Sequence, residues 1–355
     1  MTTIPTEPIG SIPRPVPLIE AVAAGDIPDP DVDPQYEAAV KDTIDRLEAT
    51  GSPVITDGEQ RKYENFWTYS VHGLSNTAPD GFRIPFAAGH TRRMPRLTRG
   101  PFRYQRYADS YLEVALRYAQ RPLKQAVISP SALSLMYPAT EIPGYSRDQF
   151  IDDLLTEHEK EIRRCLQKGA FKVQVDFTEA RLAMKIDPSG QLLNSFIDLN
   201  NLALSRFSAE DRRRIGVHTC AGGDRDSTHS ADVDYAALLP RLFELNVGYF
   251  CMALAGERDR TRVLKIVRQH MKPGRRIFVG VVSPINPRVD TPEEVRDRVL
   301  EAAEYTPIDQ LGTTDDCGFA PFSDDTSTSR DTAFAKIEAR VRGTALASDL
   351  IAGKS

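Results

Sequence analysis

Hydrophobic residues along the chain alternate between short β-branched runs and longer segments in which apolar positions recur at helical spacing. Segments 33–50, 146–168 and 291–305 have helical spacing and open on a capping residue. Eight runs have the pattern of strands: Ile4–Gly10, Pro53–Glu59, Gln125–Pro130, Lys172–Glu179, Arg214–Cys220, Val247–Leu254, Arg276–Ser283 and Gln310–Cys317. Alternating strands and helices favour parallel pairing, so we predict an α/β fold, a (βα)₈ TIM barrel, with residues 1–355 as one domain.

An open, doubly wound sheet is the alternative architecture. No glycine-rich nucleotide fingerprint follows the first run, which counts against that fold. Residues 76–106 are rich in Pro, Gly and Arg and are too long for an ordinary connection after the second strand. We therefore expect them to form an inserted hairpin or lid.

Composition and charge argue against several classes of protein. The 355 residues contain 45 Lys+Arg and 50 Asp+Glu, a net charge of −5 that leaves no basic footprint for nucleic acid or anionic membrane. No apolar run is long enough to span a membrane, and residues 1–17 lack the pattern of a secretory signal. Four scattered cysteines favour a reducing compartment over a disulfide framework, so we expect a cytoplasmic protein.

Candidate chemistry lies at the ends of the predicted strands, where barrel enzymes carry their active sites. His218 and Cys220 end the fifth strand two residues apart, so both point to the same face. Cys317 ends the eighth strand and could add a second thiolate. One imidazole and two thiolates suit zinc, although a lone His-x-Cys pair is as often a structural histidine and a small buried cysteine.

Further polar groups end other strands, namely Ser11, Asp57, Glu59, Asp176, Glu179 and Arg181. Buried carboxylates are costly unless they are paired. Structural ion pairs with Arg14, Arg61 or Arg181 would explain them, and recognition of an amine or thiol substrate would explain them equally well. The arginines 92, 93, 96 and 99 of the insertion are either an anion site or a solvated basic loop.

At these residues the sequence resembles the cobalamin-independent methionine synthase family over nearly its whole length. Ile9-Gly10-Ser11-Ile12-Pro13-Arg14 is similar to the family's start motif, whose backbone holds the homocysteine carboxylate. The resemblance implies that Glu59 contacts substrate, that Asp176 receives the substrate amine within the motif reaching Arg181, and that His218, Cys220 and Cys317 bind Zn²⁺. Zinc in this family stabilises the substrate sulfur as a thiolate, which attacks an electrophilic carbon.

Three departures from the family pattern concern the ligands and the methyl donor. The family's glutamate ligand falls on Ala253, which leaves Cys251 or Glu257 as candidate fourth ligands. The proton-delivering histidine after the seventh strand falls on Val282, and the tryptophan that stacks on folate has no counterpart. His229, in the loop after Cys220, is a candidate acid or base, with a structural loop residue as the alternative.

The leading hypothesis is therefore a zinc-dependent thiol alkyltransferase that acts on a small thiol and an alkyl donor, most simply methyl transfer to homocysteine. An epoxyalkane:coenzyme M transferase, which belongs to a related branch with a His-x-Cys…Cys ligand set, is one alternative. A metal-free lyase resembling uroporphyrinogen decarboxylase is a second, and a non-catalytic metal-binding protein is a third. The sequence does not identify the thiol or the donor, and it is compatible with a homo-oligomer.

Overall fold

A parallel sheet of six strands forms most of the central wall of the protein, in the order β10-β9-β8-β7-β6-β5. The computed structural model describes residues 3–27, 33–62, 65–87, 89, 91–223 and 226–353. The six strands are β5 (Lys124–Ile128), β6 (Lys172–Asp176), β7 (Ile215–Thr219), β8 (Tyr249–Met252), β9 (Arg276–Val282) and β10 (Leu311–Asp315). All five neighbouring pairs are parallel, as the alternating pattern predicted.

The first two predicted strands continue this wall, but each forms only an isolated bridge. Thr6 pairs in parallel with Thr313 at one edge of the sheet, and Ile55 pairs with Leu123 at the other. Two hydrogen bonds join these segments to each other. Ile12 N donates to Gly58 O at 3.0 Å, and Thr56 Oγ1 donates to Gly10 O at 2.9 Å. Eight chain segments therefore surround the core in the arrangement of a TIM barrel.

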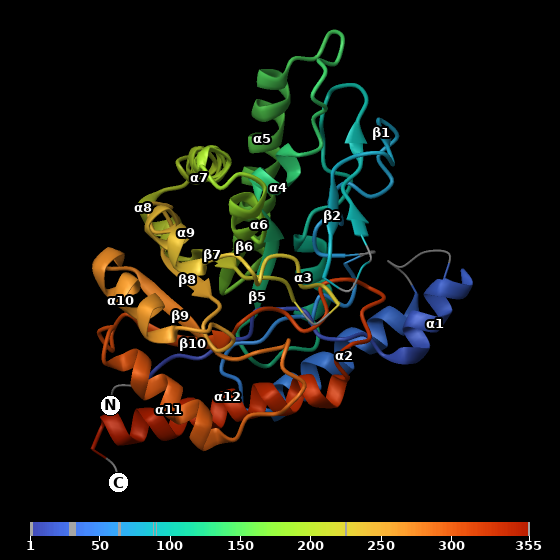
Figure 1. The fold of residues 1–355 in the computed structure, drawn as a ribbon. Helices are drawn as coiled ribbons and strands as arrows, with labels where there is room; N and C mark the ends of the chain where they lie inside the picture. The colour runs from blue at the N-terminus through green and yellow to red at the C-terminus, as the bar shows by residue number, and fades with distance from the viewer. Residues whose placement is uncertain are drawn as a thin grey trace.

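Helices follow the strands and cover the outside of the wall (Figure 1). The helices are α1 (Val16–Ala24), α2 (Pro34–Ala49), α3 (Asp109–Ala115), α4 (Pro130–Ser134), α5 (Arg147–Lys168), α6 (Glu179–Ile186), α7 (Gln191–Leu204), α8 (Ala209–Arg213), α9 (Tyr235–Leu242), α10 (Arg260–His270), α11 (Pro292–Ala303) and α12 (Arg330–Ile351). The predicted caps are present: Asp33 accepts a bond from Gln35 N, and Ser146 and Thr291 each form a capping box. Helix α12 packs against α11 and α2, so the early and late parts of the chain are neighbours (Figure 1).

The insertion after the second barrel segment is a pair of nested antiparallel ribbons, as predicted for residues 76–106. The outer ribbon pairs β1 (Thr77–Ala78) with β4 (Arg96–Leu97), and the inner one pairs β2 (Arg83–Pro85) with β3 (Thr91–Arg93). The ribbons lie on the same side of the molecule as α4 and α5 (Figure 1). Ala87 N donates to Thr228 O at 2.8 Å, which ties the inner ribbon to the loop that follows β7.

Charged residues fill part of the barrel interior as mutually paired groups. Glu7 contacts Lys172 at 2.7 Å and Lys124 at 3.4 Å, and Arg340 contacts Asp315 at 2.7 Å. Glu7, Lys124, Asp315 and Arg340 are buried, whereas Lys172 is partly exposed. Buried charges persist only when they are paired in this way. In the described ranges, no helix combines the length and apolar character that crossing a membrane requires.

Candidate metal centre and its cavity

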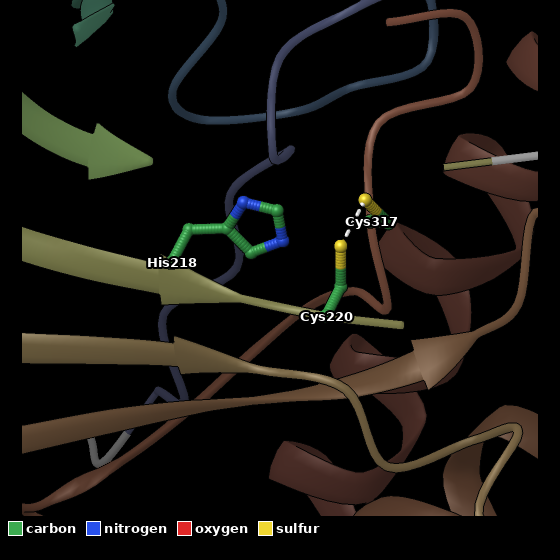
Figure 2. Close-up of side chains that lie close together, drawn as sticks. All are labelled: His218, Cys220 and Cys317. Atoms are coloured by element: carbon green, nitrogen blue, oxygen red, sulfur yellow. Dashed lines mark hydrogen bonds between the residues drawn. The ribbon is translucent and has the colours of Figure 1, made fainter. Parts of the chain in front are cut away.

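Three side chains with metal-binding atoms converge at the carboxyl ends of the barrel strands. His218 and Cys220 come from the end of β7, and Cys317 follows β10 on the far side of the sheet (Figure 2). One ligand atom from each lies within 4.8 Å of the others, and all three residues are buried. The period-2 geometry of a strand brings His218 and Cys220 to one face, as the sequence predicted.

The hydrogen bonding of this group fits a metal ion. His218 Nδ1 lies 3.2 Å from Asp176 Oδ1, while His218 Nε2 is buried with no hydrogen-bond partner among the described residues. A ring held by a carboxylate at one nitrogen, with the other nitrogen left for an ion, is the usual arrangement of a metal-ligating histidine. One imidazole and two thiolates suit Zn²⁺ in particular.

The two thiols influence each other directly. Cys220 Sγ lies 2.6 Å from Cys317 Sγ (Figure 2). Burial raises the pKa of the Cys220 thiol, but the Cys317 hydrogen bond and the His218 imidazole outweigh burial and hold that pKa well below its usual range. A thiolate, the form that binds metals, is therefore favoured at Cys220.

Neither candidate fourth ligand belongs to this group. Cys251 packs with Ile9, Tyr249 and Phe278 in the barrel interior, where burial raises its pKa to about 12. The carboxylate of Glu257 is held by Arg181 at 2.6 Å. Among the described residues, the group of ligand atoms within 4.8 Å of one another therefore contains His218, Cys220 and Cys317 only.

Arg14 and Arg181, which belong to the motifs that resemble the family's substrate site and which we predict as candidate substrate-binding residues, make internal contacts in the structure. Besides Glu257, Arg181 donates to Val233 O at 2.8 Å, and its guanidinium lies 4.8 Å from the centre of the Tyr235 ring. Arg14 donates to the backbone carbonyls of Glu59 at 2.9 Å, Gln60 at 3.1 Å and Lys62 at 2.8 Å. Arg14 thus fixes the turn that carries Glu59, because its planar fork is satisfied by three carbonyls.

A cavity lies beside the three candidate ligands. Its lining includes the carboxylates of Glu59, Asp176 and Glu179 but no lysine or arginine of the described chain. Ile9 and Ser11 also line it, as the start motif implied, although Ile9 N already donates to Asp315 Oδ2 at 3.3 Å. An acidic cavity without cationic side chains favours a ligand that carries positive charge.

Glu59 is held in this cavity by an unusual backbone. Its φ is +57°, which places a non-glycine residue in the left-handed region. A Cβ on Gly10 would lie 2.6 Å from Glu59 Oε1, so glycine at position 10 allows this close approach. Burial and the nearby carboxylates of Asp176 and Asp57 raise the pKa of Glu59 to about 7, against the opposing effect of Lys62.

Glu179, one of the polar residues predicted at a strand end, also lines the cavity. It begins α6, and its Oε1 accepts hydrogen bonds from Ser129 and Ser131, each at 2.5 Å. Burial raises its pKa to about 7. Ser129 is the N-cap of α4 and Ser131 lies in its first turn, directly after β5, and tertiary folding brings both to Glu179.

His229 lines the cavity from the loop after Cys220, as predicted for a candidate acid or base. Its Nδ1 lies 2.9 Å from Ser230 Oγ, and burial lowers its pKa to about 4. The imidazole is therefore neutral at neutral pH, which suits a base or hydrogen-bond partner better than an acid.

The arginines of the insertion clasp the protein rather than forming an open anion site. Arg92 forms a two-point contact with Asp324, at 2.6 and 3.0 Å, and Arg96 forms one with Asp80, at 3.0 Å for each bond. Asp324 lies in the loop after Cys317, so Arg92 fastens the insertion over the metal-ligand loops. Arg92 and Arg96 therefore have acidic partners within the protein, of the kind that surface ion pairs provide.

The fold and the site together define a barrel enzyme with a candidate metal centre at the carboxyl ends of its strands. Comparison with known families matches residues 4–333 to the model described as "Cobalamin-independent synthase, Catalytic domain". The chain therefore belongs to the cobalamin-independent methionine synthase family, as its motifs indicated, and is an enzyme of the methyltransferase class.

Relatives and solved structures agree with this assignment. A methionine synthase of Sulfurisphaera tokodaii is 24% identical over 99% of this chain and 94% of its own length, and an uncharacterized Bacillus subtilis protein is 24% identical over 88% and 86%. A B12-independent methionine synthase from a Shewanella species superposes with a TM-score of 0.73 at 16% identity, with 99% of each chain covered. That likeness supports the barrel fold.

Proposed function

We propose that this protein is a zinc-dependent thiol alkyltransferase that methylates an amino thiol resembling homocysteine. The observation that carries the proposal is the position of His218, Cys220 and Cys317 on the wall of a cavity that is otherwise acidic. Zinc, when bound by these residues, supplies the stabilisation that lets a thiol react as a thiolate at neutral pH. The relatives named methionine synthase, and the Shewanella structure described in complex with selenomethionine, support the same chemistry.

The cavity residues divide the recognition of such a substrate between them. Glu59 and Asp176 offer carboxylates to the substrate ammonium, and Asp176 also fixes the orientation of His218. Ser11 also lines the cavity, beside Gly318. The two residues are so close that a Cβ on Gly318 would lie 2.1 Å from Ser11 Oγ. His229 remains available as a neutral hydrogen-bond partner. The chain thereby orients the thiol and excludes water around it.

This lining also separates the two thiols considered from the sequence. Coenzyme M carries a sulfonate, which would face Glu59, Asp176 and Glu179 with no lysine or arginine of the described lining to balance it. A buried anion without a partner is strongly disfavoured. Homocysteine also carries an anionic group, its carboxylate, but its ammonium can pair with the carboxylates of Glu59 and Asp176. The cavity therefore favours amino thiols over thiols whose only charged group is an anion.

Metal analysis together with a panel of thiols tests the proposal. We expect purified protein to bind about one equivalent of zinc, Cys220→Ala to retain less than about one tenth, and the matched buried-cysteine variant Cys251→Ala to retain it. The zinc-loaded protein should accelerate alkylation of homocysteine far more than of coenzyme M. Zinc-free protein whose properties are unchanged by Cys220→Ala would favour the metal-free lyase instead.

A further inference from the structure

Four aromatic side chains from three separate segments line the cavity beside the candidate metal centre. Phe66 and Trp67 follow the second barrel segment, Phe86 comes from the insertion, and Phe322 comes from the loop after Cys317. The Phe322 ring meets Phe86 at 5.5 Å and Phe66 at 6.0 Å between centroids, both edge to face. The wall is therefore a packed cluster, built by the insertion as much as by the barrel.

The Glu179 carboxylate lies in the same cavity and is only half satisfied. Two serine hydroxyls hold Oε1, as described above, whereas Oε2 is buried with no hydrogen-bond partner among the described residues. The hydrogen bonds of the described residues include none between the Glu179 side chain and His218, Cys220 or Cys317. Glu179 is a lining residue of the cavity that the recognition of an amino thiol by Glu59 and Asp176 does not use.

Aromatic rings and a carboxylate, with no lysine or arginine in the described lining, are the elements that recognise organic cations. The faces of aromatic rings attract positive charge, and Phe322 already shows this, because the Arg92 guanidinium lies 4.5 Å from the centre of its ring. Sulfonium and quaternary ammonium groups have no N–H to donate, so rings and a nearby anion suit them better than a ring of hydrogen-bond acceptors does.

The geometry points to an onium compound, a sulfonium or a quaternary ammonium, as the alkyl donor that occupies the aromatic side of this cavity. This inference rests on the proposed thiol alkyl transfer and names its second substrate. Phe66, Trp67, Phe86 and Phe322 surround the cationic centre, and Glu179 supplies the counter-charge.

The chemistry balances without any further reactant. The thiol releases its proton to solvent water on binding, and its sulfur forms a bond to the methyl carbon of the donor. The bond between that carbon and the cationic sulfur or nitrogen breaks, and its electron pair stays on the departing atom. The leaving group is a neutral thioether or tertiary amine, so it needs no proton from the protein.

The first experiment measures binding of a cation against its uncharged isostere. Trp67 is the only tryptophan in the chain and lines the cavity, so its fluorescence reports binding directly. Choline and 3,3-dimethylbutan-1-ol have the same shape but differ in charge. We expect choline to bind at least about tenfold more tightly to the zinc-loaded protein, whereas equal affinities would overturn the inference.

Variants of the cavity residues test where the cation binds. Phe86→Leu and Glu179→Gln should each abolish most of the preference for choline, while Phe86→Tyr should keep it. The matched controls are Phe171→Leu, at an exposed phenylalanine, and Glu257→Gln, at the partner of Arg181; both should bind choline as the wild type does. Loss of preference in the controls, or its persistence in Glu179→Gln, would contradict the assignment to this wall.

Turnover then separates this inference from the proposed function. Zinc-loaded protein and homocysteine are incubated with S-methylmethionine, glycine betaine, 5-methyltetrahydrofolate or methylcobalamin, and with iodoacetamide as an unselective electrophile. Methylation by S-methylmethionine or betaine alone supports the inference and shows which onium is used. Methylation by folate or cobalamin alone overturns the inference and keeps the thiol chemistry, whereas no acceleration with any electrophile, iodoacetamide included, overturns the proposed function.

Discussion

Asp176 joins the metal centre to the substrate cavity through a single carboxylate. It lies 3.2 Å from His218 Nδ1 and accepts a bond from Gln174 Nε2 at 2.8 Å. Outer partners of this kind orient a ligating ring and raise its basicity. We expect Asp176→Asn to weaken zinc binding about 10- to 100-fold, measured by competition with a chromophoric chelator. The control Glu257→Gln should bind zinc normally; unchanged affinity in Asp176→Asn would show that the carboxylate does not support the histidine.

A variant of Arg181 tests whether this residue stabilises the fold or binds substrate. Because its guanidinium is buried against Glu257, its loss leaves a carboxylate with no partner. Arg181→Met should therefore lower the free energy of unfolding by about 3 kcal/mol, measured with urea. It should leave the KM for the thiol unchanged. A large rise in that KM with normal stability would return Arg181 to the substrate-binding role that the family resemblance implied.

For single residues, the positions of short side chains on or directly after strands could be predicted from the sequence, whereas the directions of long side chains could not. His218 and Cys220 follow from the two-residue period of a strand, and Cys317 follows from its place at another strand end. The direction of Arg181 does not follow, because a flexible side chain selects its partner from the folded surroundings. The four aromatic residues of the cavity wall could not be predicted either, because they lie in loops, where side chains have no regular spacing.

Helix α5 contacts the two segments that flank the insertion through a buried acid. Glu161 accepts hydrogen bonds from Tyr69 Oη at 2.8 Å and from Ala108 N at 3.0 Å. Burial raises the pKa of Glu161 to about 7, above its ordinary value of 4.5. The folded protein therefore keeps a proton that the unfolded chain has lost between these values, and folding stability falls as pH rises through that interval.

The predicted consequence is a stability difference that depends on pH. For Glu161 alone the loss between pH 4.5 and 7 amounts to about 3 kcal/mol. Glu161→Gln should remove this component, so its urea midpoint should fall less than the wild-type midpoint as pH rises. The exposed variant Glu141→Gln serves as the control. Parallel pH profiles for Glu161→Gln and the wild type would contradict the prediction.

Element boundaries were predictable wherever the chain could form a regular ladder. The last six barrel strands and the three capped helices lie where the pattern placed them. The first two strands shrink to single bridges because Pro5, Pro8 and Pro53 have no N–H to donate to a ladder. Positive φ angles at Gly58 and Glu59 then turn the second segment out of the strand. The same irregularities place Ser11 and Glu59 on the cavity wall.

At the scale of the whole molecule, the candidate metal centre connects two distant parts of the barrel. His218 and Cys220 end β7, whereas Cys317 follows β10, so a bound ion would fasten the wall across β8 and β9. A ligand that binds only the folded state stabilises it by about 4 kcal/mol at a thousandfold excess over its Kd.

We therefore expect chelation to lower the thermal midpoint of zinc-loaded protein and added zinc to restore it. Calorimetry or circular dichroism would follow the transition. Cys220→Ala should show no response to either treatment, and Cys251→Ala should respond as the wild type does. An unchanged midpoint for the wild type would mean that the three side chains do not hold an ion in the folded protein.

The pairing of Thr6 with Thr313 has a further consequence for how the protein is made. On a ribosome, residues 4–12 are made about three hundred residues before their partners around residues 313–320. Cys317 is made together with those partners. The early segment, with its apolar side chains exposed, therefore waits through that stretch of translation, and barrel closure and the complete ligand set become possible at the same point.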